Sequence, residues 1–251
     1  MLTEERLSAI YEYIKEKRFA HVSELSQKFY ISETSIRRDL TKLERAGLVQ
    51  KTYGGALIPE SDNEVLPLEA RSSTDSKAKS IMAQIAVSYI RSGDILFMDS
   101  SSTVLALVPF LQQFQNLTVI THGLHLAYEL VTRTDVKVYS LGGLISAHTY
   151  SANGMMTIHA LENIRANKFF FSPKGISLDR IYCASEEETE IRRMMMNGSD
   201  ETYLLCSHHK FEKTALFQLC TLAEIDHIIT DEKPSEEWIN LFSQNDINLH
   251  F

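Results

Sequence analysis

The chain has 251 residues, of which 44% are hydrophobic and 23% charged, and its formal net charge is −8. These values are typical of a globular protein with a sizeable core. They exclude a membrane-spanning helix, because the longest plain apolar run, Val104 to Leu111, is far too short. The first residues lack the pattern of a signal peptide. Three cysteines without C-x-x-C spacing favour reduced thiols in the cytoplasm over disulfides or a zinc site.

The negative charge is unevenly distributed along the chain. Residues 1–56 contain ten Lys or Arg against eight Asp or Glu, a net +2, so that the remaining residues carry −10. A mildly basic head on an acidic body is the kind of asymmetry that suggests a nucleic-acid contact confined to one domain.

Three short helices are expected in the head. Apolar residues recur at helical spacing in three sets: Leu7, Ile10, Tyr11 and Ile14; Leu25 and Phe29; Ile36, Leu40 and Leu43. Ser32 is placed to cap the third helix and Gly47 to end it. Residues 48–58 then alternate and are interrupted by Gly54-Gly55, which predicts a short β-hairpin. Together these elements predict a winged helix-turn-helix.

Two adjacent arginines, Arg37 and Arg38, lie near the start of the third helix, on the side away from its apolar stripe. In a helix-turn-helix, the first residues of the second motif helix reach base edges, and a guanidinium group binds guanine or phosphate. The predicted DNA-binding residues are Thr34, Ser35, Arg37 and Arg38, with Lys51 and Tyr53 on the wing. The alternative is a solvated helix face in which an arginine pairs with Asp39 or Glu44.

The remaining chain is expected to form a linker, 58–76, and a larger domain, 77–251, after a head of residues 1–57. In the larger domain short apolar segments alternate with helical stretches, which predicts an α/β fold with a mainly parallel sheet flanked by helices. The expected strands contain ILFM, LTVIT, VKVYSL, KFFFS, TYLLC and HIIT. Ligands of such sheets bind at the carboxyl ends of the strands.

Residues 22–57 resemble the N-terminal domain of DeoR-family transcriptional regulators. The matching residues are Ile36 to Leu40 (IRRDL) and Gly54 to Ala56 (GGA), whereas Tyr53 replaces a usual His and Lys51 a frequent Arg. The resemblance implies a DNA-binding head joined to a sugar-phosphate sensor domain. Such sensors are related to ribose-5-phosphate isomerase and coenzyme A transferases.

A weaker resemblance to these sensor domains continues through the larger domain. A turn between a strand and a helix N-terminus offers N–H groups and hydroxyls to a phosphate, although the run at 100–103 could be only a helix cap. The residues expected to bind the effector are Asp99, Ser100, Ser101, Ser102, Thr103, Thr121, His122, Gly142, Gly143, Glu188 and Lys210.

Four positions depart from the family pattern in ways that leave the effector's identity open. Ser101 replaces Gly, His122 replaces Asn, and both Asn167 and Cys206 replace Asp. Loss of the two carboxylates argues against isomerase-like catalysis, so no enzyme activity, catalytic residue or cofactor is expected. No metal is expected either, because no nearby carboxylate or Cys completes a ligand set of known spacing with His122 and His125 or with His208 and His209.

The sequence therefore predicts a cytoplasmic DNA-binding regulator, a repressor of sugar-metabolism genes, that binds operator DNA as a homodimer or homotetramer. A phosphorylated sugar or related metabolite would modulate that binding, and no membrane partner is expected. The alternatives are a sugar-phosphate isomerase-like enzyme and a regulator whose larger domain no longer senses a ligand. The operator, the regulated genes, the sign of regulation and the oligomer size do not follow from the sequence.

Overall fold

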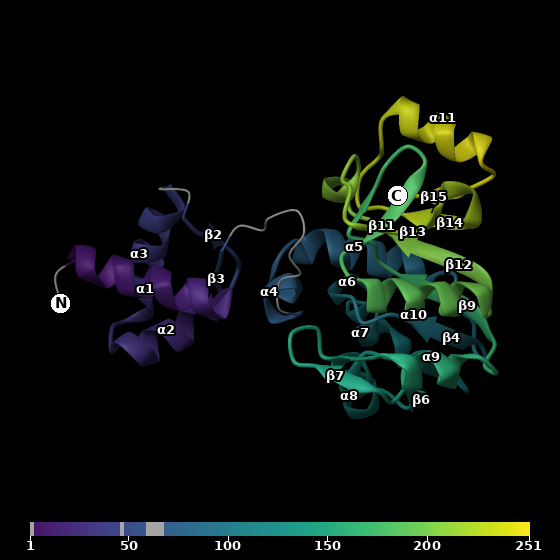
Figure 1. Ribbon diagram of the computed structural model, residues 1–251, viewed down its shortest axis with the longest axis horizontal. Helices are drawn as coiled ribbons and strands as arrows, with labels where there is room; N and C mark the ends of the chain where they lie inside the picture. The colour runs from purple at the N-terminus through teal and green to yellow at the C-terminus, as the bar shows by residue number, and fades with distance from the viewer. Residues whose placement is uncertain (1–2, 46–47, 59–67) are drawn as a thin grey trace. The chain divides into compact units, whose positions relative to one another are not determined.

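The computed structural model describes residues 3–45, 48–58 and 68–251 (Figure 1). The chain divides into two compact units, residues 1–76 and 77–251. None of the described helices is both long and apolar enough to cross a membrane.

The first unit contains the predicted helices and hairpin. Its elements are α1 (Thr3–Lys17), β1 (Phe19–His21), α2 (Val22–Phe29), α3 (Glu33–Arg45), β2 (Gln50–Lys51), β3 (Gly55–Leu57) and α4 (Leu68–Ser73). The three strands form an antiparallel sheet in the order β1-β3-β2. Strand β1 was not predicted, and Gly47, the expected end of the third helix, lies outside the described residues.

The predicted apolar stripes of the three helices meet in one core. Ile10 and Ile14 of α1, Leu25 of α2 and Ile36 and Leu40 of α3 are all buried. Burial of each such side chain contributes about 1.5–3 kcal/mol, which stabilises a unit that is otherwise small.

Helix α4 lies inside the segment that was expected to be an irregular linker. Its first residue, Leu68, is buried, and the helix packs against β1. The end of this segment is therefore part of the first unit's folded structure.

The second unit is built on the predicted parallel sheet. Its strands are β4 (Ile95–Met98), β5 (Thr118–Thr121), β6 (Lys137–Ser140), β9 (Ala166–Phe171), β12 (Ser199–Leu205), β14 (His227–Ile229) and β15 (Asn248–His250). They are ordered β15-β14-β12-β9-β4-β5-β6, and every neighbouring pair is parallel. The α/β prediction is confirmed, although β15 was not among the expected strands.

Helices cover both faces of this sheet, as Figure 1 shows. They are α5 (Ser76–Val87), α6 (Ser102–Leu105), α7 (Val108–Leu111), α8 (Leu124–Arg133), α9 (Met155–Leu161), α10 (Glu186–Asn197) and α11 (Glu236–Gln244), with short 3-10 helices η1 (His208–Lys210) and η2 (Leu222–Glu224). Alternate strand residues serve opposite faces: Phe169 and Phe171 pack with α9, α10 and α11, whereas Phe170 packs with α5 to α8.

Two small antiparallel sheets complete the second unit, and neither was predicted. Strands β7 (Leu144–Ser146) and β8 (Ser151–Asn153) form a hairpin. Strands β10 (Gly175–Ile176), β11 (Arg180–Cys183) and β13 (Phe217–Thr221) form the other.

The strand order reverses between β4 and β9. From β4 the chain proceeds outward through β5 to β6, and from β9 it proceeds the opposite way through β12, β14 and β15. Such a switch point opens a place for ligands at the carboxyl ends of the two central strands. Here those ends lead to Asp99 and Ser172.

Candidate functional site

The start of α3 is built by a serine cap. Ser32 accepts a hydrogen bond from the backbone N–H of Ser35 at 3.3 Å, and the two hydroxyls lie 3.0 Å apart, which confirms the predicted cap. Thr34 is exposed and Ser35 is half-buried. The hydroxyl of Ser35 is thus partly engaged by the cap, whereas Thr34 faces solvent.

Asp39, the residue after the paired arginines, is not their partner. It is buried, and its carboxylate accepts two hydrogen bonds from Arg6 of α1, from Nε at 2.7 Å and Nη2 at 3.1 Å. This bidentate pair joins α1 to α3. The alternative in which Asp39 neutralises Arg37 or Arg38 is therefore wrong.

Both arginines of the pair remain on the exposed side of α3. The guanidinium of Arg37 lies 3.5 Å from Glu33, a surface contact worth little in water. Arg38 is exposed and forms no hydrogen bond or ion pair with the residues that the structure describes. Two cationic groups are thus available at the N-terminal half of α3.

The wing residue Lys51 is held against α3. Its Nζ lies 3.0 Å from the Thr41 hydroxyl and 3.7 Å from a Glu44 carboxylate oxygen, and its backbone N–H donates to Glu44 at 2.9 Å. Lys51 therefore fixes the wing to the helix. Tyr53 is 93% exposed in the turn before β3.

At the switch point of the second unit, Asp99 is completely buried and accepts hydrogen bonds from three protein groups. Its donors are the backbone N–H of Ser101 at 2.9 Å, the backbone N–H of Ser172 at 3.2 Å and the Nε of Arg192 at 3.0 Å. The carboxylate thus ties together β4, β9 and α10. That arrangement fits a structural anchor better than the effector contact expected from the sequence.

Arg192 is a site residue that sequence reasoning missed. It is buried on α10 between two carboxylates, and its Nη1 lies 3.1 Å from Glu188 and 3.3 Å from the Cys183 sulfur. Because Asp99 lies 93 positions away, no local spacing indicates the pair. Removing one member of such a buried group leaves an uncompensated charge and typically costs about 3–5 kcal/mol.

The serine run after Asp99 forms the start of α6. The Ser101 hydroxyl accepts the backbone N–H of Val104 at 3.2 Å and so caps the helix. Ser100, Ser102 and Thr103 are also buried. Capping is thus established for Ser101, while phosphate binding by this run stays a prediction.

The ends of β5 and β6 lie beside this loop. Thr121 is buried and accepts the N–H of Gly123 at 2.9 Å, while a Cβ on Gly123 would lie 3.1 Å from the Cα of Ser100. After β6, Gly143 has φ +153°, and a Cβ there would meet the Thr157 hydroxyl at 2.2 Å. The neighbouring Gly142 carbonyl accepts that hydroxyl at 2.8 Å. Gly143 therefore serves close packing, whereas a Cβ on Gly142 would meet nothing within 4 Å.

His122 is buried, and neither ring nitrogen has a hydrogen-bond partner among the described residues. Burial lowers its pKa to about 4, against smaller opposing effects of Asp99 and Glu188, so the ring is neutral at pH 7. A neutral imidazole offers one donor and one acceptor. Because buried polar groups without partners are rare in proteins, such a group is a candidate for contact with a ligand.

Lys210 reaches the carboxyl end of β9 from η1. Its Nζ lies 2.8 Å from the Ser172 hydroxyl and 2.7 Å from the Pro173 carbonyl. Since the N–H of Ser172 binds Asp99, the ammonium group lies one residue from the central anchor. Lys210 is thus connected to Asp99 through Ser172, and Glu188 is connected to Asp99 through Arg192.

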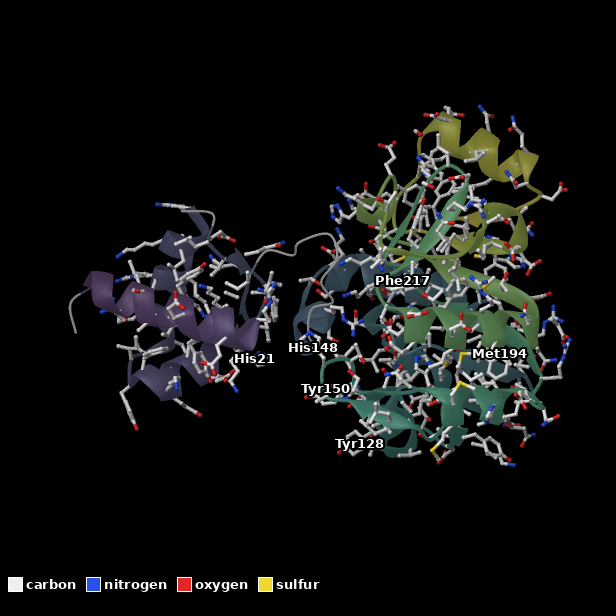
Figure 2. All side chains as sticks on the ribbon, in the orientation of Figure 1. His21, Tyr128, His148, Tyr150, Met194 and Phe217 are labelled. Carbon is white, nitrogen blue, oxygen red and sulfur yellow. The ribbon has the colours of Figure 1, made fainter. Side chains whose placement is uncertain are left out.

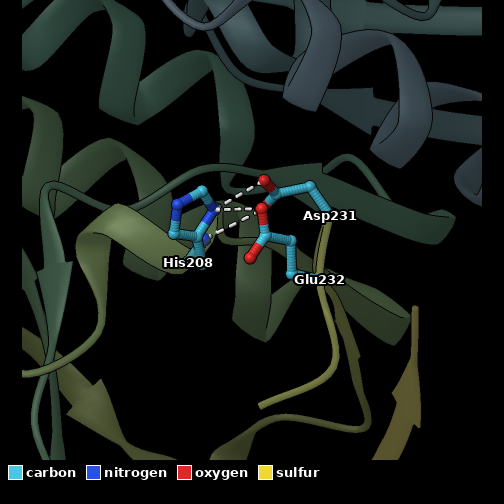
Figure 3. Close-up of side chains that lie close together, drawn as sticks. All are labelled: His208, Asp231 and Glu232. Carbon is cyan, nitrogen blue, oxygen red and sulfur yellow. Dashed lines mark hydrogen bonds and ion pairs between the residues drawn. The ribbon is translucent and has the colours of Figure 1, made fainter.

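The loop that carries Lys210 is anchored by His208, and Figure 3 shows the contacts of His208 with Asp231 and Glu232. Asp231 accepts the backbone N–H of His208 at 2.8 Å and lies 2.7 Å from its Nδ1, while Glu232 lies 3.7 Å from the same nitrogen. Burial raises the pKa of Asp231, but the hydrogen bonds from His208 outweigh it and the pKa is lowered.

This cluster corrects the view that the paired histidines lack carboxylates. Within the described chain, His208, Asp231 and Glu232 form the one group of three potential metal ligands, with ligand atoms within 4.8 Å of one another. The existing hydrogen bonds already account for His208 and Asp231 as a loop anchor. The absence of a metal stays a prediction.

Two of the four departures from the family pattern lie at opposite ends of the sheet. Asn167 does not lie with the effector residues: it is exposed at the start of β9 and accepts the N–H of Ile95, the first residue of β4, at 2.8 Å. It therefore belongs to the amino end of the sheet. Cys206 does follow β12 at the carboxyl end, but burial raises its pKa to about 12, so the thiol stays protonated.

The two units define a winged helix-turn-helix protein with an α/β sensor domain, and comparisons with known proteins agree. Residues 6–62 match the family model described as the DeoR-like helix-turn-helix domain, and residues 74–232 match the DeoR C terminal sensor domain. The chain belongs to the DeoR family of transcriptional regulators.

Similar proteins include both a repressor and an activator of transcription. The chain is 30% identical to the HTH-type transcriptional repressor GlcR of Bacillus subtilis, over 99% of this chain and 96% of that protein. It is 31% identical to the L-fucose operon activator of Haemophilus influenzae, over 95% and 96%. A ribose 5-phosphate isomerase A structure from Methanocaldococcus jannaschii covers 56% of each chain at 12% identity and TM-score 0.41, which is too low to support any argument.

Proposed function

We propose that this protein represses sugar-metabolism genes in the cytoplasm by binding operator DNA through α3 and the wing. A phosphorylated sugar bound in the second unit would weaken that binding. The protein would act as a homo-oligomer and not as an enzyme. The names of similar proteins include a repressor and an activator, so the sign of regulation belongs to the proposal.

The observation that carries the DNA-binding proposal is the arrangement around Asp39. Arg6 satisfies Asp39 inside the unit, which leaves Arg37 and Arg38 on the exposed side of α3. Asp39, the carboxylate next to the two arginines in the sequence, is therefore not available to pair with them. Guanidinium groups at the first turns of a recognition helix are suited to guanine edges and to phosphates.

The observation that supports an effector site is the buried, unpartnered ring of His122 beside the switch point. The ring can donate to one ligand oxygen and accept from a sugar hydroxyl, and Lys210 supplies a positive charge at the end of β9, on the other side of β4. We place the effector at the carboxyl ends of β4, β5 and β9, in contact with these two residues and the 100–103 loop.

A matched pair of double variants tests the DNA-binding proposal. The preferred site is first selected from a random duplex DNA library, and binding is measured by fluorescence anisotropy. Arg37→Ala with Arg38→Ala should weaken binding at least about 100-fold, because each bidentate base contact is worth about 1–3 kcal/mol. Lys42→Ala with Arg45→Ala removes the same charge from the exposed side of the same helix, further along it.

The control should lose less than about 10-fold, because distant charges act only through the general field. Equal losses in the two double variants would show that bulk charge alone drives binding and would refute recognition by the paired arginines. Circular dichroism should give the same helix content for all three proteins.

A further inference from the structure

One stretch of the second unit has no charged side chain. Residues 138–161 contain no Asp, Glu, Lys or Arg over 24 positions, in a chain that is 23% charged. A segment of this composition is expected inside a protein. It comprises most of β6, the β7-β8 hairpin and α9.

Much of this stretch nevertheless lies on the surface. The exposed fraction is 80% for Leu144, 73% for Met156 and 61% for Met155. Ile145 and Tyr150 are also exposed, and we call these five residues the uncharged face. Large exposed apolar side chains gathered in this way mark an interaction surface.

The elements that carry the uncharged face adjoin one another. Strand β8 packs against α9 and α8, and α8 in turn packs against β6. Helix α8 adds Tyr128 and Val131, both more than 60% exposed and three positions apart on one side of the helix. Figure 2 shows Tyr128 and Tyr150 at the same end of the second unit. Among the described strands β6 pairs only with β5, so its other edge is open.

Charge identifies the partner that this face suits. The second unit, residues 77–251, contains 14 Lys or Arg against 20 Asp or Glu, a net −6, so two copies of it repel each other over most of their surfaces. A face without charge is where two acidic bodies can approach with the least repulsion and bury apolar area. An acidic or basic partner would gain no electrostatic attraction there.

We infer that the uncharged face is the contact between two copies of this chain across a two-fold axis. A two-fold contact brings the same patch of both copies together. It also supplies the paired DNA-binding units that a helix-turn-helix protein needs to read two half-sites, an advantage that rests on the proposed function. The contact itself does not depend on DNA.

Two charged residues placed in the face test this inference on the full chain. Wild-type protein should sediment as a dimer or larger in analytical ultracentrifugation, and Leu144→Glu with Met156→Glu should dissociate it, raising the dissociation constant at least about 10-fold. Leu216→Glu is the matched control, because Leu216 is 69% exposed in the loop before β13, outside the face. It should keep the wild-type mass, and both proteins should melt as the wild type does.

A monomeric wild type, or a double variant that keeps the wild-type mass, would overturn the inference. A charge-reversal arm identifies the partner: Leu144→Lys with Met156→Lys should also dissociate alone, and mixing it with the glutamate variant should restore the dimer. Failure of the mixture to associate would exclude a face that meets its own copy. Because the repelling charges are screened by salt, wild-type association should tighten between about 0.05 M and about 0.3 M salt.

Discussion

At position 122 a buried imidazole has no hydrogen-bond partner among the described residues, which is unfavourable for folding. An unsatisfied buried polar group costs about 1–3 kcal/mol, so His122→Leu should raise the free energy of unfolding by about 1–2 kcal/mol at pH 7.5. The same variant should lose the thermal shift that a sugar phosphate produces in the wild type. A residue whose removal stabilises the fold and abolishes the response is one retained for binding.

The difference in stability between His122→Leu and the wild type should depend on pH in a definite direction. The pKa of His122 is about 4 in the folded protein and near 6.5 when unfolded, so between these values only the unfolded chain binds the proton. The free energy of unfolding of the wild type is therefore unaffected by this titration above pH 6.5 and falls as the pH drops towards 4. The advantage of His122→Leu over the wild type should grow by up to about 1.4 kcal/mol per pH unit across that window.

Urea unfolding of both proteins between pH 7.5 and pH 5 measures the difference in their free energies of unfolding. Differential scanning fluorimetry with glucose 6-phosphate, ribose 5-phosphate and glycerol 3-phosphate measures the thermal shift that each sugar phosphate produces. Thr230→Val is the control, since the Thr230 hydroxyl is buried and unpartnered at the end of β14. It should stabilise the fold without changing the response. A destabilised His122→Leu that still responds would remove His122 from the effector site.

At the scale of elements, the wing depends on one of two adjacent glycines. A Cβ on Gly55 would lie 2.2 Å from the carbonyl oxygen of Ala20, because β1 and β3 pair at that point. Gly55→Ala should therefore destabilise the first unit by about 1–3 kcal/mol, as overpacking does, and weaken DNA binding by displacing the wing. Gly54→Ala is the control, since its Cβ would meet only the His21 ring, at 3.6 Å.

Thermal unfolding followed by circular dichroism, together with anisotropy on the selected DNA site, compares the two variants. Gly54→Ala should stay close to the wild type in both measurements. Equal stability of the two alanine variants would mean that the β1-β3 pairing does not hold the wing.

The elements that could be predicted from sequence are those whose pattern is long enough to repeat. Helix α3 has an apolar stripe and a serine cap, and the strands of the parallel sheet are apolar runs between helices. Strand β1 and the antiparallel strands have two to five residues each, too short for alternation to be recognised. Their pairing is decided by tertiary contacts.

The candidate site shows the same limit. Asp99 and His122 could be named from the resemblance to the sensor family, because its motif residues directly follow apolar strands. Arg192 was missed because its partner is distant in sequence, and Asn167 was misplaced because a motif does not tell which end of a strand a residue occupies. The chemical role that one residue can play can be predicted from the sequence. Which distant residues meet at one site depends on the fold and cannot be predicted in that way.

At the scale of the whole molecule, the proposed effector site and the uncharged face share a hairpin. The backbone N–H of Ala152 in β8 donates to the carbonyl of His122 at 2.7 Å, and Ser151 forms a β-bridge with Gly123. A ligand that shifts the backbone at 122 therefore acts directly on the strand that pairs with β7. Binding of the effector and association of two copies should be coupled free energies.

The coupling is testable because it must be reciprocal. The sugar phosphate with the largest thermal shift should change the dimer dissociation constant by about 5–150-fold, the range of typical allosteric couplings. By linkage, the affinity for that sugar phosphate should differ by the same factor between dimeric wild type and the dissociated Leu144→Glu, Met156→Glu protein. Sedimentation with and without ligand gives the first factor, and isothermal titration calorimetry gives the second. Ligand affinities that agree within about two-fold, with an unchanged dissociation constant, would separate sensing from assembly and leave the β7-β8 hairpin without a role in transmission.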